Sequence, residues 1–255
     1  MADKPIGPSF LCIGAQKSGT TWLYEMLKHH PDVRFPGGKE VHFWSVHYAK
    51  GLDWYKDLFD GPGVTGDITP AYAILPPRKV AELHALNPSV PIIFFIREPV
   101  ARAWSLARMN LANMQKTLAK LGEGAQIQDF DLNDSWFYRN FTLQQAVDRG
   151  RYAQTLRRWW KHFDKSQFLI VRFEDIAASP RTVLQRITAH IGIDATPFDG
   201  MSEAQLGTRV FAGRDLHFKL EYRQFLFQLF RDDVVDLQNM TGMDLSDWLV
   251  PPCEE

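Results

Sequence analysis

The sequence predicts an α/β fold of three layers, with a central parallel sheet and helices on both of its faces. Three apolar runs carry this prediction, and they begin at Phe10, Ile92 and Phe168. The run at 92–96 is apolar at every position and lies between prolines, which is typical of a strand buried on both faces of a parallel sheet. A stretch with helical periodicity follows each run, so we expect helices to flank the sheet.

Periodicity and helix-ending residues predict the remaining elements. In the first half we expect helices at 20–29, 48–59, 78–86 and 100–110, a loop of short extended pieces at 33–44, and a short strand from Gly66 that Pro70 ends. In the second half we expect helices at 151–163 and 221–240, and one that starts at Pro180 with Ser179 as its N-cap. Residues 109–150 lose clear periodicity, and we interpret them as a lid or an acceptor-binding insertion.

Length and composition are compatible with one domain over residues 1–255. The chain is 45% hydrophobic, enough for a full core, and its net charge is −1, with 29 basic and 30 acidic residues. This balance creates no field that favours nucleic acid or a heavily sulfated polymer. The eight histidines form no ligand-spaced pattern, so we expect no metal.

The apolar runs are too short to span a bilayer, for which about 20 residues are needed, and the first residues lack the apolar core of a signal peptide. Cys12 lies in the first apolar run and Cys253 in the polar tail, which is the cysteine usage of a reducing compartment. We therefore expect a cytoplasmic protein.

The first apolar run passes through a turn with glycines at 14 and 19 into a helix. Such a turn aims backbone N–H groups and a helix dipole at an anion. An ATP-binding loop of this spacing has lysine directly after the second glycine, but Thr20 stands there and Lys17 lies earlier, inside the turn. The turn therefore predicts a phosphorylated ligand and disfavours a nucleotide kinase.

A second anion-binding group follows the run at 92–96. Arg97 ends that run, and Ser105 comes eight residues later, two helical turns onward. Ligands of open parallel sheets bind at the carboxyl ends of the strands, and Lys17 and Arg97 both lie just past such ends. We expect the two to meet one ligand.

Several segments resemble sulfotransferases that use 3′-phosphoadenosine 5′-phosphosulfate (PAPS), in particular the heparan-type enzymes and their soluble bacterial relatives. The similar segments are KSGTT at 17–21, REPVARAWS at 97–105, KEVHFW at 39–44, TPAY at 69–72, IVRFEDI at 170–176 and GMDLSDWL at 242–249. The resemblance implies a P-loop-type fold and transfer of a sulfo group from PAPS to a hydroxyl, with 3′-phosphoadenosine 5′-phosphate (PAP) as product. No metal takes part in this chemistry.

The resemblance also implies roles for single residues. Loop amides and threonine hydroxyls hold the 5′-phosphate, Lys17 lies by the oxygen that bridges phosphorus and sulfur, and Trp22 packs on adenine. Arg97 and Ser105 hold the 3′-phosphate. The residues expected to bind the nucleotide are Lys17, Ser18, Gly19, Thr20, Thr21, Trp22, Arg97, Ser105, Gly213 and Arg214.

Glu40 corresponds to the glutamate that acts as catalytic base in the heparan-type enzymes. His42 lies two residues on and projects to the same side if the segment is extended. It orients Glu40, binds the leaving sulfonate or is itself the base, and sequence spacing does not choose among these. The alternative for Glu40 is a surface carboxylate paired with Lys39.

The acceptor is predicted only as a class. Ser45 stands where some heparan-type members have an aspartate, Ile68 where they have a lysine, and Ala212 where they have the lysine of a late nucleotide loop. The first two differences argue against a heparan-like acceptor. Because the charge is balanced and there is no basic run, we expect a hydroxyl of a sugar, a lipid-like molecule or a natural product, with a polyanionic polysaccharide as the second choice. Candidate side chains for stacking on it are Trp44, Trp54, Trp104, Trp136, Phe137 and Tyr138.

A PAP- or PAPS-binding module without catalysis is the alternative from a different class of protein. Lys17, Glu40 and His42 occur together, and a pure binding protein needs no base beside the phosphosulfate. The sequence therefore favours an enzyme. It does not indicate an oligomeric state.

Overall fold

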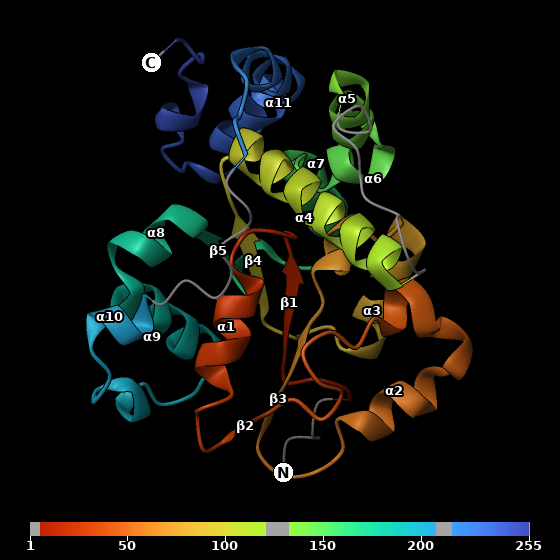
Figure 1. Cartoon of the computed structure of the whole chain (residues 1–255). Coiled ribbons are helices and arrows are strands. Elements are labelled where there is room, and N and C mark those ends of the chain that lie inside the picture. Colours follow the sequence, from red (N-terminus) through yellow and green to blue (C-terminus); the bar gives the residue numbers. More distant parts are fainter. Residues whose placement is uncertain (1–5, 121–132, 208–215, 255) are drawn as a thin grey trace. The chain divides into compact units, whose positions relative to one another are not determined.

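A computed structural model describes residues 6–120, 133–207 and 216–254 (Figure 1). The chain divides into two compact units, one of Met1–Arg97 with Leu156–Val210 and the other of Glu98–Thr155 with Phe211–Glu255. Whether the two act as a single domain stays a prediction. None of the helices in the described ranges has both the length and the apolarity needed to cross a membrane.

The first unit contains a five-stranded sheet whose neighbouring strands are all parallel. Its order is β2-β3-β1-β4-β5, and the strands are β1 (Phe10–Gly14), β2 (Val33–Arg34), β3 (Val64–Ile68), β4 (Ile92–Ile96) and β5 (Phe168–Arg172). The chain adds β2 and β3 on one side of β1 and then β4 and β5 on the other. Since the strand order reverses at β1, the crevice for a ligand is expected at the carboxyl end of this strand.

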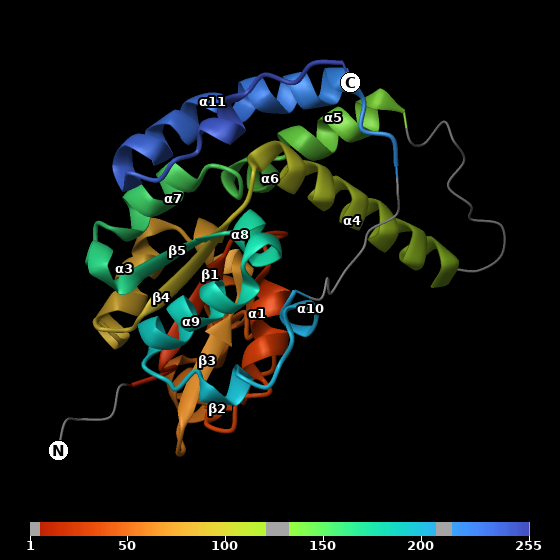
Figure 2. The same ribbon diagram turned by 90° about the vertical axis from the view of Figure 1, so that its left-hand side faces the viewer.

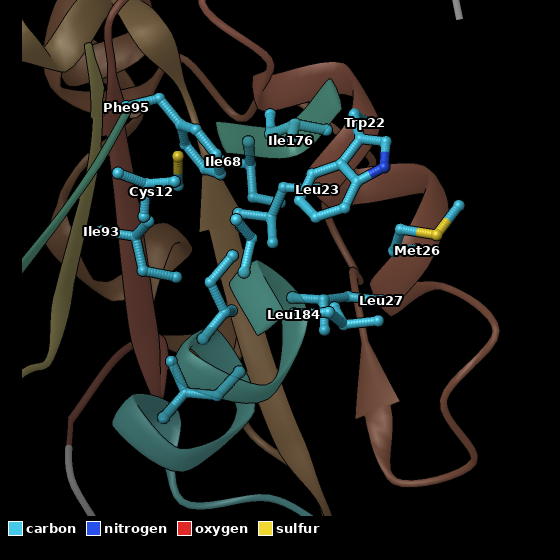
Figure 3. Close-up of a cluster of buried hydrophobic side chains, with 14 of the residues drawn as sticks. Cys12, Trp22, Leu23, Met26, Leu27, Ile68, Ile93, Phe95, Ile176 and Leu184 are labelled. Carbon is cyan, nitrogen blue, oxygen red and sulfur yellow. The ribbon is translucent and has the colours of Figure 1, made fainter. Parts of the chain in front are cut away.

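Helices cover both faces of this sheet, as predicted. Leu23 and Leu27 of α1 (Thr20–Leu27), Ile176 of α8 (Phe173–Ala178) and Leu184 of α9 (Pro180–Ile191) belong to one buried cluster with side chains of the strands (Figure 3). Figure 2 views the unit with α8 and α9 in front of the sheet.

The opposite face of the sheet carries two other helices. Leu11 of β1 lines a small cavity together with Tyr55 of α2 (Leu52–Leu58) and Leu83 of α3 (Pro77–Leu86). The three-layer α/β fold predicted from the sequence is therefore confirmed.

Local details of the first unit differ from the prediction. The helix expected at 48–59 is a 3₁₀ turn, Tyr48–Lys50, followed by α2, because Gly51 interrupts it with a φ of 86°. The segment after Glu40 forms a π-helical turn, Phe43–His47. α8 was not predicted, and β5 is only partly buried because it is the edge strand. The remaining short elements of this unit are α10 (Glu203–Leu206) and three 3₁₀ turns, Pro70–Ile74, Lys165–Gln167 and Thr196–Phe198.

The second unit is helical in its described part. It contains α4 (Pro99–Lys120), α5 (Asp134–Thr142), α6 (Gln144–Asp148), the start of α7 (Tyr152–Trp159), α11 (Leu220–Thr241) and a 3₁₀ turn, Ser246–Leu249. The expectation of an irregular segment from residue 109 is wrong for the described residues. α4 continues ten residues past Asn110, because no glycine or proline interrupts 100–120 and Leu111 is buried.

Candidate active site

The turn between β1 and α1 depends on a glycine. Gly19 is the N-cap of α1 and has a φ of 106°, a conformation that side chains with a Cβ rarely adopt. A Cβ at this position would lie 2.7 Å from Cδ1 of Ile176. Because α8 packs this closely, the position before α1 has no room for a side chain larger than that of glycine.

Ser18 supplies the clearest sign of a ligand in this turn. Its side chain is fully buried, and among the described residues its hydroxyl has no hydrogen-bond partner. A buried hydroxyl without a partner costs stability unless a ligand or water completes it. An anion at the N-terminus of the eight-residue α1 would accept this hydrogen bond. The turn therefore fits a phosphate group.

Arg97 lies against the same turn. Its Nη1 donates a hydrogen bond to the carbonyl oxygen of Lys17 at 3.1 Å, and its guanidinium lies 4.5 Å from the centre of the Phe173 ring. Lys17 itself has a φ of 71°. The structure thus brings Lys17 and Arg97 together from the ends of β1 and β4, and their roles toward a ligand stay predictions.

Glu40 and His42 form a carboxylate–imidazole pair. Nε2 of His42 lies 3.0 Å from Oε2 of Glu40, and the two side chains are 33% and 35% exposed. The pair does not arise from an extended segment, because His42 has a φ of 55° and opens the π-helical turn. Lys39 also forms an ion pair with Glu40. The contacts are therefore compatible both with a base oriented by His42 and with a surface carboxylate paired with Lys39.

Thr69 links the segment that carries this pair to β1, the strand that leads into the turn 15–19 (the anion turn, named for its proposed role). Its Oγ1 accepts a hydrogen bond from the N–H of Val41 at 3.0 Å, and its own N–H donates to the carbonyl oxygen of Cys12 at 3.0 Å. Cys12 lies in β1, two residues before the strand ends at Gly14. The segment with Glu40 is therefore tied to the strand that leads into the turn.

A buried carboxylate, which sequence reasoning missed, lies behind Thr69. Asp67 is fully buried in β3 and accepts hydrogen bonds from the hydroxyls of Thr69, Tyr55 and Tyr72 at 2.6, 2.9 and 3.0 Å. Burial raises the pKa of Asp67 to about 6, and the three hydrogen bonds and the charge of His42 oppose this rise. An aspartate inside the short strand expected from Gly66 is a local signal for this carboxylate, whereas only the fold shows its tyrosine partners.

Of the residues expected to bind the nucleotide, Trp22 differs from expectation and Ser105 lies in the second unit. Trp22 belongs to the core, with 4% exposure and its Nε1 donating to the carbonyl oxygen of Leu206 at 2.6 Å, so as placed it presents no open face for adenine. Thr20 and Thr21 begin α1, as predicted. Ser105 lies on α4 in the second unit, and its pairing with Arg97 stays a prediction.

Gly213 and Arg214 lie outside the described residues, as does Ala212. Their contact with the nucleotide stays a prediction.

Half of the candidate acceptor-stacking residues are core residues instead. Trp44, Trp104 and Phe137 are 2%, 6% and 8% exposed, which leaves them no face for a ligand. They were mispredicted because exposure depends on contacts between distant elements. Trp54, which lies under Nζ of Lys50, is partly exposed, as are Trp136 and Tyr138, and for these the role stays a prediction.

The described residues contain no group of three or more His, Cys, Asp or Glu side chains arranged to hold a metal ion. A glycine turn at a helix N-terminus and a carboxylate–imidazole contact, both linked to one strand of a parallel sheet, are compatible with an enzyme that transfers a group from a phosphorylated donor.

Comparison with known proteins agrees with this class. The sequence profile of the sulfotransferase domain matches residues 8–209. The chain therefore belongs to the sulfotransferase domain family, which consists of transferase enzymes.

Individual relatives are similar over most of this chain. It is 31% identical over 189 residues to heparan sulfate glucosamine 3-O-sulfotransferase 3B1 of Mus musculus, covering 73% of this chain and 46% of that protein. It is 32% identical over 192 residues to heparan sulfate glucosamine 3-O-sulfotransferase 6 of Homo sapiens, covering 73% and 52%. The chain thus spans about half the length of these curated relatives.

Among solved structures, a sulfotransferase from Alicyclobacillus acidocaldarius is similar with a TM-score of 0.66 and 25% identity. The similarity covers 94% of this chain and 98% of that one.

Proposed function

We propose that this chain transfers a sulfo group from PAPS to a hydroxyl of a carbohydrate acceptor and releases PAP. The observation that carries the proposal is the buried hydroxyl of Ser18, which has no hydrogen-bond partner among the described residues. Ser18 lies in the turn that connects β1 to α1, and β1 also anchors the segment with Glu40 and His42 through Thr69. Membership of the sulfotransferase family supports the sulfo group as the group transferred.

In the proposed reaction the acceptor oxygen attacks sulfur and forms a new S–O bond. The bond between sulfur and the bridging oxygen breaks, and that oxygen leaves with the electron pair on the phosphate of PAP. Glu40 takes the acceptor proton, a contribution of roughly 10²- to 10⁴-fold. Lys17 stabilises the charge that develops on the bridging oxygen. His42 orients Glu40 through their 3.0 Å contact.

The carbohydrate class of the acceptor is supported by the names of the relatives, which act on heparan sulfate glucosamine. This chain lacks two charged residues that the resemblance places near the acceptor or the base in heparan-type enzymes, a lysine at position 68 and an aspartate at position 45. Ile68 is fully buried in β3, where a side chain cannot face an acceptor, and Ser45 places a hydroxyl, not a carboxylate, 3.2 Å from Nδ1 of His42. Ile68 supplies no positive charge for a sulfated sugar, and the net charge of the chain is −1, so we propose a hydroxyl on a sugar that carries less negative charge than heparan.

Two measurements test the donor and the acceptor. Titration calorimetry is expected to give tight binding of PAP and weaker binding of ATP, and tighter binding of ATP would refute the use of PAPS. Mass spectrometry of incubations with PAPS and a panel of sugars, lipid-like alcohols and natural products is expected to show the mass gain of one sulfo group on a sugar. PAP binding without product from any acceptor would identify a binding module instead.

The variant Glu40→Gln tests the assignment of the base. We expect kcat to fall by about 10²- to 10⁴-fold while the Kd of PAP stays unchanged, because only proton transfer is removed. Glu25→Gln is the matched control, since Glu25 forms an ion pair with Lys28 and its side chain is 32% exposed, close to the 35% of Glu40. If Glu40→Gln retains as much turnover as the control, Glu40 is a surface carboxylate and His42 becomes the candidate base.

A further inference from the structure

We propose that Asp67 and Thr69 are positioning residues that hold the backbone of the segment carrying Glu40 and His42. The inference rests on the proposed function, because it concerns the geometry of the same acid–base pair. Neither side chain is exposed, so neither can contact an acceptor directly. Their effect on the reaction is exerted through the segment 40–44.

The direction of each hydrogen bond follows from the chemistry of a carboxylate. An ionised carboxylate only accepts, so the hydroxyls of Thr69, Tyr55 and Tyr72 all donate to Asp67. Burial and the charge of Asp67 raise the pKa values of both tyrosines well above the ordinary range, so their hydroxyls keep the protons that they donate. Because each hydroxyl has already donated its only proton to Asp67, its oxygen can form further hydrogen bonds only as an acceptor.

Those lone pairs are directed at backbone N–H groups. Oγ1 of Thr69 accepts from Val41 at 3.0 Å and from His42 at 3.4 Å. Oη of Tyr72 accepts from the N–H of Trp44 at 3.5 Å. One buried carboxylate therefore orients two hydroxyls that together hold three N–H groups of the segment.

This arrangement explains how His42 keeps an uncommon backbone conformation. A φ of 55° is rarely adopted by a residue other than glycine and persists only where the surroundings impose it. The N–H groups of Val41, His42 and Trp44 are fixed on both sides of the Cα of His42. Without them the imidazole would lose its orientation toward Glu40.

Hydrogen exchange and kinetics together test the proposal with the pair Thr69→Val and Thr69→Ser. Valine keeps the volume and removes the hydroxyl, whereas serine keeps the hydroxyl. Thr188→Val is the matched control, because Thr188 is a buried threonine of α9 whose hydroxyl donates to the carbonyl oxygen of Gln185. All variants are made in the full chain.

We expect Thr69→Val to speed the exchange of the Val41 and His42 amides about five- to tenfold, the effect of one lost hydrogen bond. We expect kcat to fall about 10²-fold with the KM for PAPS unchanged, since the donor site is intact while the base is misplaced. Thr69→Ser should restore both values to within about threefold of wild type, and Thr188→Val should change neither.

A double-mutant cycle separates positioning from a general loss of stability. If Thr69 acts through Glu40, Thr69→Val lowers kcat far less in a Glu40→Gln background than in the wild type. Equal losses in the two backgrounds, or unchanged exchange at Val41 and His42, would overturn the proposal. Absence of turnover in the wild type would refute the proposed function, whereas the exchange rates would still decide whether Thr69 holds the segment.

Discussion

Asp67→Asn should change how the stability of the protein depends on pH. Asparagine has nearly the volume of aspartate but does not titrate, so subtracting the variant's free energy of unfolding from that of the wild type isolates the ionisation of Asp67. Folded Asp67 has a pKa of about 6, above its ordinary value of 3.8. Between these two values the folded state binds more protons than the unfolded state, so the stability of the wild type falls as pH rises.

The magnitude follows from the two pKa values. Their difference corresponds to about 3 kcal/mol at 1.36 kcal/mol for each pH unit. Asp67 is fully buried, so solvent does not screen this contribution. About 2 kcal/mol of it falls between pH 4 and pH 7, because the lower part of the titration lies below that interval. Relative to Asp67→Asn, the wild type is therefore expected to lose about 2 kcal/mol across this range.

Urea unfolding followed by tryptophan fluorescence at pH 4, 5, 6 and 7 measures this difference for both proteins. We expect it to fall with a midpoint near pH 5 and to level off above pH 7. A difference that stays constant would show that Asp67 titrates alike in both states. A difference that grows with pH would show a lowered pKa, and either result would refute the balance between burial and hydrogen bonding described for this carboxylate.

Two further predictions concern the anion turn. Gly19→Ala should lower the free energy of unfolding by about 1–3 kcal/mol and weaken PAP binding, because φ is 106° and the new Cβ would meet Ile176. A thermal melt and a PAP titration unchanged from wild type would contradict this tight contact. Ser18→Ala should raise the Kd of PAP about tenfold without lowering the stability of the ligand-free protein, since the hydroxyl of Ser18 has no partner among the described residues. Loss of stability with an unchanged Kd would contradict a role of Ser18 in anion binding.

The sequence was sufficient for features that depend on neighbours along the chain. The strands at Phe10, Ile92 and Phe168, the parallel sheet and the glycine turn between β1 and α1 all follow from local patterns of apolar residues and glycines. The proximity of Arg97 to Lys17 followed from the rule that strand ends share one edge of a parallel sheet.

Features that depend on contacts between distant elements were not predictable. Asp67, Tyr55 and Tyr72 come from β3, α2 and a 3₁₀ turn, and only the folded sheet brings them together. That His42 lies near Glu40 was expected from an extended segment, but the positive φ of His42 and the π-helical turn that it opens were not. The core position of Trp22 likewise depends on Phe95 and Leu206, which lie far along the chain.

The hydrogen bond from the Thr69 amide to Cys12 gives the proposed donor and base sites a common origin in β1. The carboxyl end of that strand continues into the turn that would hold the phosphosulfate. Thr69 is bonded to the same strand and accepts a hydrogen bond from Val41, the residue after the proposed base Glu40. We expect the spacing between sulfur donor and base to be unaffected when surrounding helices or loops change in evolution. Acceptor preference can then diverge in those surroundings while the geometry of the transfer step is inherited unchanged.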